Sequence, residues 1–192
     1  MKRAMQKRTL KTRARLISVS EDLVRDAGYE ALRVDDVVRL AGVAKGTFFA
    51  HFRDKDALME ILIGDALSRR LEQAGTLPSP TDIPALIAAL EPIHSFMTSE
   101  RYVFDVILRY SGAAAIAETG PIAQCFGRYV ELVSDWLTEA QFRQDISAEL
   151  QAEGVQAFAV QAMALKFCAL HSAQGIKDRL RMYLDAWLAP AT

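Results

Sequence analysis

The sequence predicts an all-α protein with two parts, an N-terminal helix-turn-helix unit and a larger C-terminal helical unit. Two observations support this fold class. Apolar residues recur at the three- and four-residue spacing of amphipathic helices along most of the chain, and no alternating β pattern is found. Between residues 75 and 84, three prolines fall within seven residues and break the helical pattern. We therefore expect one domain over residues 1–74, a linker over 75–84 and a second domain over 85–192.

The first helix is expected from about Thr9 to Ala27, and Gly28 ends it. Tyr29 and Leu32 then pack the turn that follows. The predicted core face of this helix consists of Leu16, Ser20, Leu23, Val24 and Ala27.

Four apolar residues at the spacing i, i+3, i+4 and i+7 predict an amphipathic helix over residues 34–41. Asp35 and Asp36 lie in its first turn, where the helix dipole favours carboxylates. Gly42 supplies the left-handed residue that ends the helix. Val43 is a single apolar residue that can fill the gap to the next helix.

A shorter helix is expected over residues 45–51, and its start is polar. Lys45, Gly46 and Thr47 combine small size with hydrogen-bond donors. A helix-turn-helix presents its recognition helix in this way, because the N-terminus of that helix enters the major groove of DNA. The alternative is a buried helix pair, which would not need a polar start followed by Phe-Phe-x-His-Phe. We therefore expect this segment to contact double-stranded DNA.

Asp54 is a suitable N-cap for a fourth helix, from Lys55 to about Gln73. Its apolar residues are expected to pack on the first helix and to lead into the second domain. After the linker, Thr81 or Asp82 can cap the next helix. The helices expected in the second domain cover residues 83–99, 100–111, 121–144, 148–173 and 176–188, with a short alanine-rich piece at 112–118.

The formal net charge of −1 is unevenly distributed along the chain. Residues 1–55 hold 13 Lys and Arg against 7 Asp and Glu, whereas the rest of the chain is acidic. Seven of these basic residues lie within residues 1–16, which contain no acid. A basic end attracts the phosphate backbone of DNA. A solvated tail is the alternative for this segment alone, but beside a helix-turn-helix we interpret it as a DNA contact.

Several classes of protein do not fit the sequence. It has no glycine-rich phosphate loop, nucleophile elbow or metal-spaced His and Cys set, so we expect no enzyme, no cofactor and no metal. No charge-free apolar stretch is long enough to span a membrane, and no apolar run follows the basic N-terminus as in a signal peptide. We expect a cytoplasmic protein. Cys125 and Cys168 fit reduced thiols, with a redox sensor as the alternative.

Residues from about Thr9 to Leu67 resemble the DNA-binding domain of the TetR (tetracycline-repressor) family of bacterial regulators. The resemblance implies a homodimer with an N-terminal three-helix DNA-binding unit. It also implies a C-terminal domain for dimerisation and for a small molecule that releases the DNA, but beyond about residue 75 only the all-helical plan carries over. The matching residues are Gly28-Tyr29, Val34-Asp35-Asp36-Val37, Ala41-Gly42-Val43, Lys45-Gly46-Thr47, the aromatic pair with His51-Phe52, and Lys55 followed by Leu58.

The candidate DNA contacts lie on and around the second of the two short helices. Lys45 can reach a phosphate or a guanine edge, and Thr47 can contact a phosphate or a thymine methyl group. Gly46 lets the backbone come close to the DNA. The resemblance adds His51 and Lys55, which stand where matching family residues bind phosphate.

Three further residues of the predicted DNA site depart from the family pattern. Arg33 and Ala44 stand where Thr or Ser is common, so both short helices lose their usual side-chain cap, at a cost of roughly 1 kcal/mol each. Phe49 stands where Tyr is common and therefore lacks a phenolic hydrogen bond to the DNA backbone. We expect the added charge of Arg33 and of the N-terminal segment to offset part of the lost affinity.

The second domain interleaves polar and aromatic residues with apolar ones, as ligand pockets in helical domains do. An ordinary core looks nearly the same, and for any single residue, such as His94, the core is the more common environment. Pro92 can kink its helix and open space. We expect an apolar or aromatic effector, with an anionic group that faces Arg109. The candidate pocket residues are His94, Met97, Phe104, Arg109, Cys125, Tyr129, Trp136 and Met163.

The last two predicted helices, 148–173 and 176–188, are apolar on too many sides for a helix at the surface. The simplest cover is the same helix pair from a second copy, although burial within one chain is the alternative. A homodimer of this kind fits a palindromic operator. The predicted function is therefore a transcriptional repressor that an effector releases. A DNA-binding protein without a pocket is the alternative, and a ligand cavity distinguishes the two.

Overall fold

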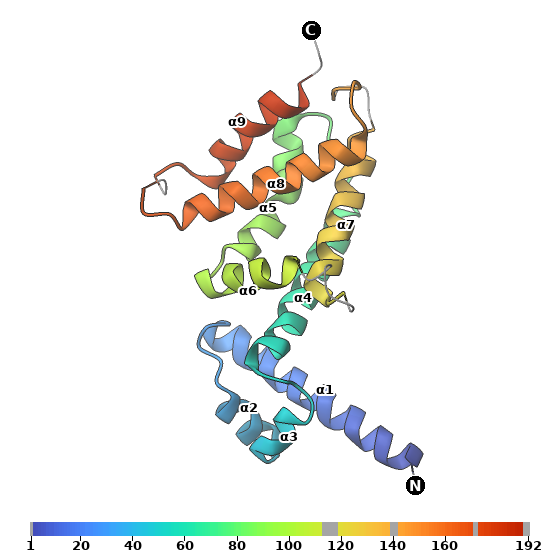
Figure 1. Cartoon of the computed structure of the whole chain (residues 1–192), viewed down its shortest axis with the longest axis vertical. Helices are drawn as coiled ribbons and strands as arrows, with labels where there is room; N and C mark the ends of the chain where they lie inside the picture. The colour runs from blue at the N-terminus through green and yellow to red at the C-terminus, as the bar shows by residue number, and fades with distance from the viewer. Residues whose placement is uncertain (1, 113–118, 139–141, 171–172, 190–192) are drawn as a thin grey trace.

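The computed structural model describes residues 2–112, 119–138, 142–170 and 173–189, and every regular element in these ranges is an α-helix (Figure 1). The predicted all-α class is confirmed. In chain order the helices are α1 (Lys2–Ala27), α2 (Val34–Ala41), α3 (Lys45–Phe49), α4 (Lys55–Ala74), α5 (Ile83–Met97), α6 (Arg101–Ser111), α7 (Pro121–Trp136), α8 (Ala148–Lys166) and α9 (Ile176–Leu188).

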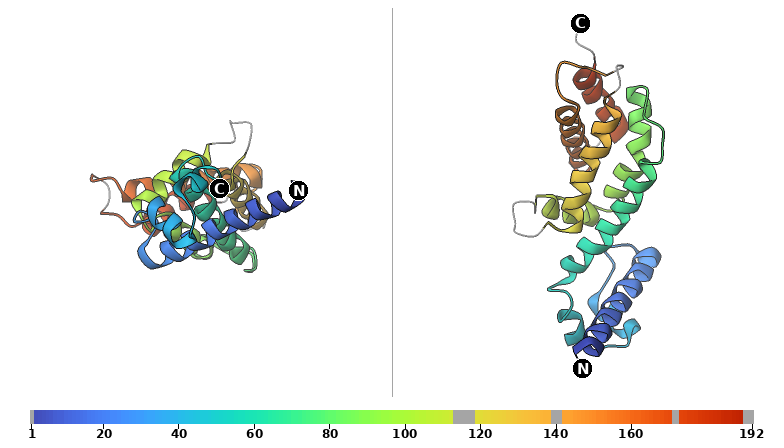
Figure 2. Two further views of the ribbon diagram at one scale, coloured as in Figure 1. Left: turned by 90° about the horizontal axis from the view of Figure 1, so that it is seen from below. Right: turned by 90° about the vertical axis from the view of Figure 1, so that its right-hand side faces the viewer.

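The molecule is elongated, with α1, α2 and α3 at one end and α8 and α9 at the other (Figures 1 and 2). Helix α4 joins the two ends. It contacts α1 at the N-terminal end of the molecule, and it packs on α5, α6 and most extensively on α7. Within the described residues, no helix combines the length and the apolar character needed to cross a membrane.

The three N-terminal helices share a small core with the first half of α4. Helix α1 packs on α2, and α2 packs on α3. The side chains that fill this core are almost fully buried, because each lies on the apolar face that its helix turns inward. They include Leu16, Val37, Ala41, Phe48, Phe52 and Leu58.

The ends of the short helices follow the predicted caps. Gly42 ends α2 with φ of 61°, in the left-handed region that favours glycine. Arg33 and Ala44 precede α2 and α3 without a side-chain cap, as expected. The Asp54 carboxylate starts α4 by accepting a hydrogen bond from the Ala57 N–H at 2.8 Å.

The larger C-terminal end consists of α5 to α9 and the second half of α4. Helix α7 lies between α4 and α8, and α9 packs on both α8 and α5. Asp82 caps α5 by accepting from the Ala85 N–H at 2.7 Å, and Pro84 occupies the first turn. The fully buried residues of this core include Leu86, Leu90, Ile107, Ile122, Val133, Val155 and Leu184.

Three N-terminal predictions need correction. Helix α1 begins at Lys2 rather than Thr9, so the basic segment is part of a helix and not a tail. Ala27 at the other end of α1 is exposed and does not belong to the core. Helix α3 ends at Phe49, before His51, and a tight turn follows it.

Two C-terminal helices end earlier than predicted, because tertiary contacts stop them. Helix α7 ends at Trp136 instead of residue 144. The Arg143 N–H beyond it donates to the Leu188 carbonyl oxygen at 3.1 Å, so this part of the chain joins the end of α9. Helix α8 ends at Lys166 instead of residue 173, and Phe167 then packs on Phe104, with ring centroids 5.5 Å apart. Most of the alanine-rich piece at 112–118 lies outside the described residues.

Candidate nucleic-acid interface and effector cavity

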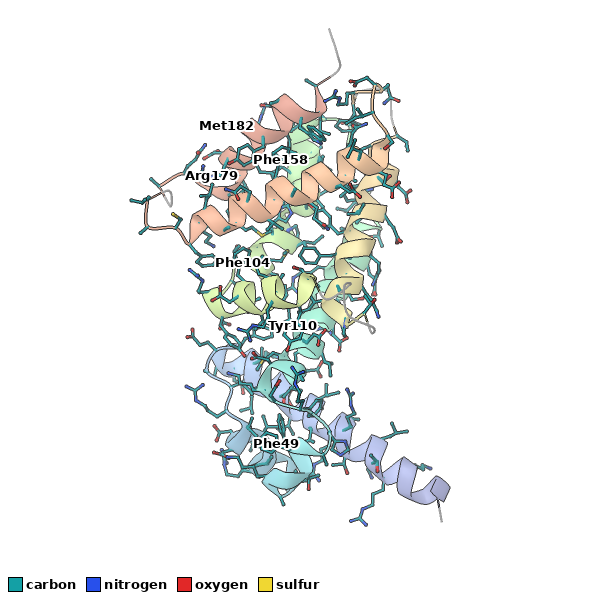
Figure 3. The ribbon with its side chains drawn as sticks, viewed as in Figure 1. Phe49, Phe104, Tyr110, Phe158, Arg179 and Met182 are labelled. Carbon is teal, nitrogen blue, oxygen red and sulfur yellow. The ribbon has the colours of Figure 1, made fainter. Side chains whose placement is uncertain are left out.

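Helix α3 is attached to the N-terminal core through aromatic side chains. Phe48 is fully buried, and its ring lies 5.2 Å from that of Phe52 and 5.3 Å from that of Phe49. Phe49 points outward with half of its surface exposed, at the N-terminal end of the molecule (Figure 3). This anchoring holds α3 on one side and leaves its other side open to a partner.

The start of α3 offers a cation and open space. Lys45 is exposed, and its Nζ forms an ion pair with Asp35 of α2 at 2.7 Å. Exposed pairs of this kind contribute at most about 1 kcal/mol, so a DNA phosphate or base edge can replace Asp35. No atom lies within 4 Å of the position that a Cβ would take at Gly46. Packing within the chain therefore does not require a glycine here, and the space is available to DNA.

The structure places most of the other predicted contacts around α3. Ala44 is exposed, and Thr47 and His51 are half-buried. Arg33 is exposed before α2, where its guanidinium donates to the Glu30 carbonyl oxygen at 2.9 Å. The loop thus fixes the position of this cation.

Lys55 lies beside Arg33, since both donate to the Glu30 carbonyl oxygen, but it also faces α6. Its ammonium is 4.6 Å from the centre of the Tyr102 ring on α6, and it donates to the Glu30 carbonyl oxygen at 3.3 Å. Burial is the largest cause that lowers the pKa of Lys55, and the nearby charge of Arg33 lowers it further. In this conformation Lys55 contacts both α6 and the loop before α2, and its role as a phosphate contact stays a prediction.

Helix α1 carries the basic N-terminal residues on a rod that projects past α2 and α3 (Figure 1). Lys7, Arg8, Lys11 and Arg15 are exposed along it. Arg13 instead stacks over the Phe52 ring at 5.1 Å. The exposed basic residues of α1 therefore extend the positively charged surface beyond α3, where they can attract the phosphate backbone of DNA.

A small cavity of about 20 Å³ lies among α4, α5, α7 and α8, so a ligand larger than a water molecule must displace part of its wall. Apolar side chains form most of its wall, among them Leu67 and Leu71 of α4 and Ile93 of α5. Five of the eight predicted pocket residues line it, namely His94, Met97, Cys125, Tyr129 and Met163.

A buried pair supplies most of the polarity of this cavity. His94 Nε2 and the Tyr129 hydroxyl oxygen are 3.0 Å apart, and both side chains are almost fully buried. Burial lowers the pKa of His94 to about 4, so the imidazole is neutral at pH 7. Burial also raises the pKa of the Cys125 thiol, which donates to the Gly64 carbonyl oxygen at 3.4 Å. The cavity is therefore uncharged, with a few hydrogen-bonding groups.

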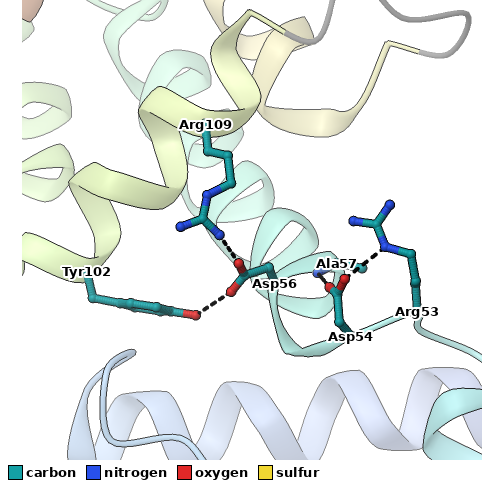
Figure 4. A network of polar contacts seen from close by, with 6 residues as sticks. All are labelled: Arg53, Asp54, Asp56, Ala57, Tyr102 and Arg109. Atoms are coloured by element: carbon teal, nitrogen blue, oxygen red, sulfur yellow. Dashed lines mark hydrogen bonds and ion pairs between the residues drawn. The ribbon is translucent and has the colours of Figure 1, made fainter.

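The other three predicted pocket residues do not line the cavity. Phe104 packs on Phe167, and Trp136 is buried at the far end of α7. Arg109 forms an ion pair with Asp56 of α4, so it is not available to an anionic group in the cavity (Figure 4). Sequence spacing placed these residues on the correct helices, but the direction of a side chain around its helix depends on tertiary packing.

The connection between the two ends of the molecule was not predicted from the sequence. The Glu100 carboxylate accepts from the N–H groups of Tyr29 and Glu30, both at 2.9 Å. Asp56 accepts from the Tyr102 hydroxyl at 2.9 Å, in addition to its ion pair with Arg109 (Figure 4). These contacts join residues 46 to 71 positions apart in the chain, and no local pattern in the sequence indicates them.

Comparison with known proteins now identifies the N-terminal unit. Residues 16–62, which include the core of α1, the two short helices and the start of α4, match the model of the tetR family of bacterial regulatory proteins. The N-terminal part of the chain is therefore similar to the DNA-binding domain of the TetR family. The matched residues include the N-terminal core, to which α3 is attached at the surface of the molecule. Among the described residues, no cluster of three or more His, Cys, Asp or Glu side chains is arranged to hold a metal ion.

Similar sequences include transcriptional regulators of the helix-turn-helix type. The uncharacterized HTH-type transcriptional regulator YvdT of Bacillus subtilis is 28% identical over 111 residues, which cover 57% of each chain. An uncharacterized HTH-type regulator of Haemophilus influenzae is 25% identical over 156 residues, 80% of this chain and 75% of the relative. Rv2912c of Mycobacterium tuberculosis is 35% identical over 94 residues, 47% of each chain. The chain thus matches only about half the length of two of these three relatives.

Solved structures show the same fold along nearly the whole chain. RolR in complex with resorcinol has a TM-score of 0.63 and 20% identity, over 92% of this chain and 89% of RolR. FadR of Thermus thermophilus, in complex with lauroyl-CoA, has a TM-score of 0.61 and 16% identity, over 91% of this chain and 92% of FadR. At these identities the similarity establishes the fold.

Proposed function

We propose that this chain is a TetR-family regulator that represses transcription by binding a palindromic operator as a homodimer, and that a small, neutral, mostly apolar effector releases it. The observation that carries this proposal is the cavity. One of its walls is α4, through Leu67 and Leu71, and the start of the same helix belongs to the N-terminal core. We assign residues 1–74 to DNA binding, 75–84 to the linker and 85–192 to effector binding and dimerisation.

The lining of the cavity supports a neutral effector. No Lys, Arg, Asp or Glu is among its described lining residues, and His94 is uncharged at neutral pH. An ionised ligand would lose its hydration without gaining a counter-charge, at a cost of several kcal/mol. One hydroxyl group on the ligand can exchange hydrogen bonds with the His94–Tyr129 pair. RolR and FadR, which share the fold, were solved with resorcinol and lauroyl-CoA, and this supports a ligand role for the cavity.

The contacts between α4 and α6 support a mechanism by which a ligand in the cavity changes the position of the DNA-binding helices. A ligand that displaces Leu67 and Leu71 also displaces the first turn of α4, where Asp56 is bound by Tyr102 and Arg109 of α6. Such a movement changes how the N-terminal helices lie relative to the rest of the dimer. The effector can release DNA only to the extent that it binds the released conformation more tightly than the DNA-bound one.

Exposed apolar side chains of α8 and α9, at the end of the molecule opposite to α3, support dimerisation. Met182 of α9 is 60% exposed, and Leu150 at the start of α8 is 46% exposed. Phe158 lies near Met182 at this end, half-buried against Tyr183 and Trp187 (Figure 3). A second copy of the same helix pair would cover the exposed apolar side chains, and a two-fold axis there would place two copies of α3 on one side of the DNA.

The test uses the full chain and proceeds in two steps. An operator is selected from random double-stranded DNA, and neutral aromatic and aliphatic compounds are then screened by thermal shift. We expect stabilising compounds to weaken operator binding, measured by fluorescence anisotropy, by at least tenfold. A variant that fills the cavity, Ala159→Phe, should lose the thermal shift. If compounds stabilise the protein but leave operator affinity unchanged, the chain is a DNA-binding protein without effector control.

A further inference from the structure

A second hollow, separate from the cavity, opens on the surface where the two ends of the molecule meet. It is an open groove between α1, α4 and α5 with a volume of about 530 Å³. An adjoining hollow of about 520 Å³ shares Arg69, Arg70, Phe96 and Ser99 with it. We call these two together the arginine groove. None of its lining residues lines the cavity.

Two neighbouring cations of α4 line the groove without a carboxylate partner. Neither Arg69 nor Arg70 forms an ion pair with any described residue, whereas Arg25 on the rim is paired with Asp22 at 2.8 Å. Glu21 is the one carboxylate among the described lining residues. Burial lowers the pKa of Arg70, and the positive charge of Arg69 lowers it further, while Tyr29 acts in the opposite direction. The two guanidinium groups therefore repel each other, and an anion between them would relieve this repulsion.

The position of Arg70 is fixed by its neighbours. Its guanidinium lies over the Phe96 ring, 4.1 Å from the ring centre, and its Nη1 donates to the Ala66 carbonyl oxygen at 2.8 Å. These contacts leave other N–H groups of the same guanidinium available, because arginine has five donors in a rigid fork. The donors are thus oriented before any ligand arrives.

The groove also has an aromatic wall. The rings of Tyr29 and Phe96 meet edge to face, with centroids 5.8 Å apart, and both rings line the groove. Both arginines act on the phenol, because their positive charges lower the pKa of Tyr29 against the larger effect of burial, which raises it. Tyr29 lines the groove together with both arginines, so its hydroxyl is a third polar group of the same site. Cationic donors beside aromatic rings suit a ligand that has an anionic group and a flat ring.

We propose that the arginine groove is a second ligand site, which binds a small organic phosphate with an aromatic ring. A phosphate monoester carries about −1.5 to −2 charges at pH 7 and three acceptor oxygens, which match two guanidinium groups better than a single carboxylate does. The groove is lined by Val24 and Arg25 of α1 and by Phe96 of α5, so the ligand would connect the N-terminal helices to the C-terminal core. Its binding would fix their relative orientation and thereby change DNA affinity. This site is independent of the neutral effector of the cavity.

The test measures binding of phenyl phosphate to the full chain by isothermal titration calorimetry at constant ionic strength. Inorganic phosphate, benzoate and phenol are compared with it. We expect phenyl phosphate to bind more tightly than all three. Arg69→Gln and Arg70→Gln should each weaken phenyl phosphate by about tenfold, since each removes a charged hydrogen bond. Arg69 is exposed, so the Arg69→Gln variant keeps its fold, and circular dichroism verifies this.

Two variants serve as controls for binding elsewhere. Arg128→Gln removes an exposed cation of α7 outside the groove, and Lys45→Gln removes a cation of the DNA site. Both should bind phenyl phosphate as the unchanged protein does. Absence of phenyl phosphate binding, or equal binding by Arg69→Gln and Arg70→Gln, would overturn the proposal. Benzoate binding as tight as that of phenyl phosphate would overturn the assignment of a phosphate.

Discussion

Lys45 is held by an ionic partner on the neighbouring helix before DNA arrives. Its pairing with Asp35 at 2.7 Å orients the ammonium at the start of α3, while Asp35 also places a negative charge beside the expected path of the DNA. Lys55 has a different environment, against Tyr102 and the Glu30 carbonyl oxygen. The sequence predicted a base or phosphate contact for Lys45 and a phosphate contact for Lys55, and the structure adds their different surroundings.

This difference predicts different effects of the two lysines on DNA binding. Lys45→Ala should weaken operator binding by about tenfold and reduce operator preference over random DNA, because a base or phosphate contact is lost. Lys55→Ala should leave the salt dependence of binding almost unchanged. Asp35→Asn should strengthen binding, since it removes a competing charge. Anisotropy titrations at several salt concentrations measure these effects. An unchanged operator preference in Lys45→Ala would remove Lys45 from base recognition.

His94 predicts a specific dependence of stability on pH. Its pKa is about 4 in the folded chain and about 6.5 in the unfolded chain. Between these values only the unfolded state binds the proton, so the stabilising contribution is complete above pH 6.5 and decreases as the pH falls towards 4. The expected loss is about 3 kcal/mol. Urea denaturation at pH 7 and pH 4 should show it. His94→Gln, which can still hydrogen-bond to Tyr129, should show a loss smaller by about this amount, and an equal loss would refute a neutral buried His94.

At the scale of helices, the sequence predicts best where local signals are strong. Helix α2 has its predicted bounds, because a clear apolar face lies directly before Gly42, which has a left-handed conformation. The ends of α7 and α8 were predicted too late, because their sequences continue to favour helix where contacts with α9 and α6 take the chain elsewhere. Five of the predicted pocket residues line the cavity, whereas Arg109, which fits the same mixture of polar and apolar residues in the sequence, pairs with Asp56 outside it.

The crossing of α4 and α7 depends on a glycine that the helical pattern does not explain. A Cβ at Gly64 would lie 2.5 Å from the Cβ of Pro121, so the two helices are in direct contact there. Gly64→Ala should reduce the free energy of unfolding by about 1–3 kcal/mol through overpacking. Gly127 of α7 is the matched control, because no atom lies within 4 Å of its Cβ position. Gly127→Ala should increase stability by up to about 1 kcal/mol. Urea denaturation tests both, and equal effects would contradict a tight crossing.

At the scale of the whole molecule, α4 connects a DNA-binding end to a cavity and then to an apolar end. The helices that carry these regions follow one another along the elongated molecule (Figure 2). Residues from distant segments join them, such as Glu100 with the N–H groups of Tyr29 and Glu30. The sequence could indicate each region separately from composition and motif. It could not indicate their connections, because each of these depends on two segments that meet only in the folded chain.

The proposed dimer is a property of the whole molecule, and the proposed operator binding depends on it. Leu184 is fully buried within the chain, so a charge there would unfold the protein and would not test the interface. Met182 and Leu150 are exposed and give a cleaner test. Met182→Glu combined with Leu150→Glu should convert a dimer into a folded monomer in sedimentation at micromolar concentration. The monomer should bind operator far more weakly, because two half-sites about 34–36 Å apart need two connected copies of α3.

The matched control for this experiment is Leu108→Glu, which places the same charge on an equally exposed leucine of α6. It should sediment as the unchanged protein does. Circular dichroism should show the same helix content for all variants, because every replaced side chain is exposed. If the double variant remains a dimer with full operator affinity, α8 and α9 do not form the two-fold interface. Another face of the molecule would then have to hold the two copies of α3 in register with the DNA.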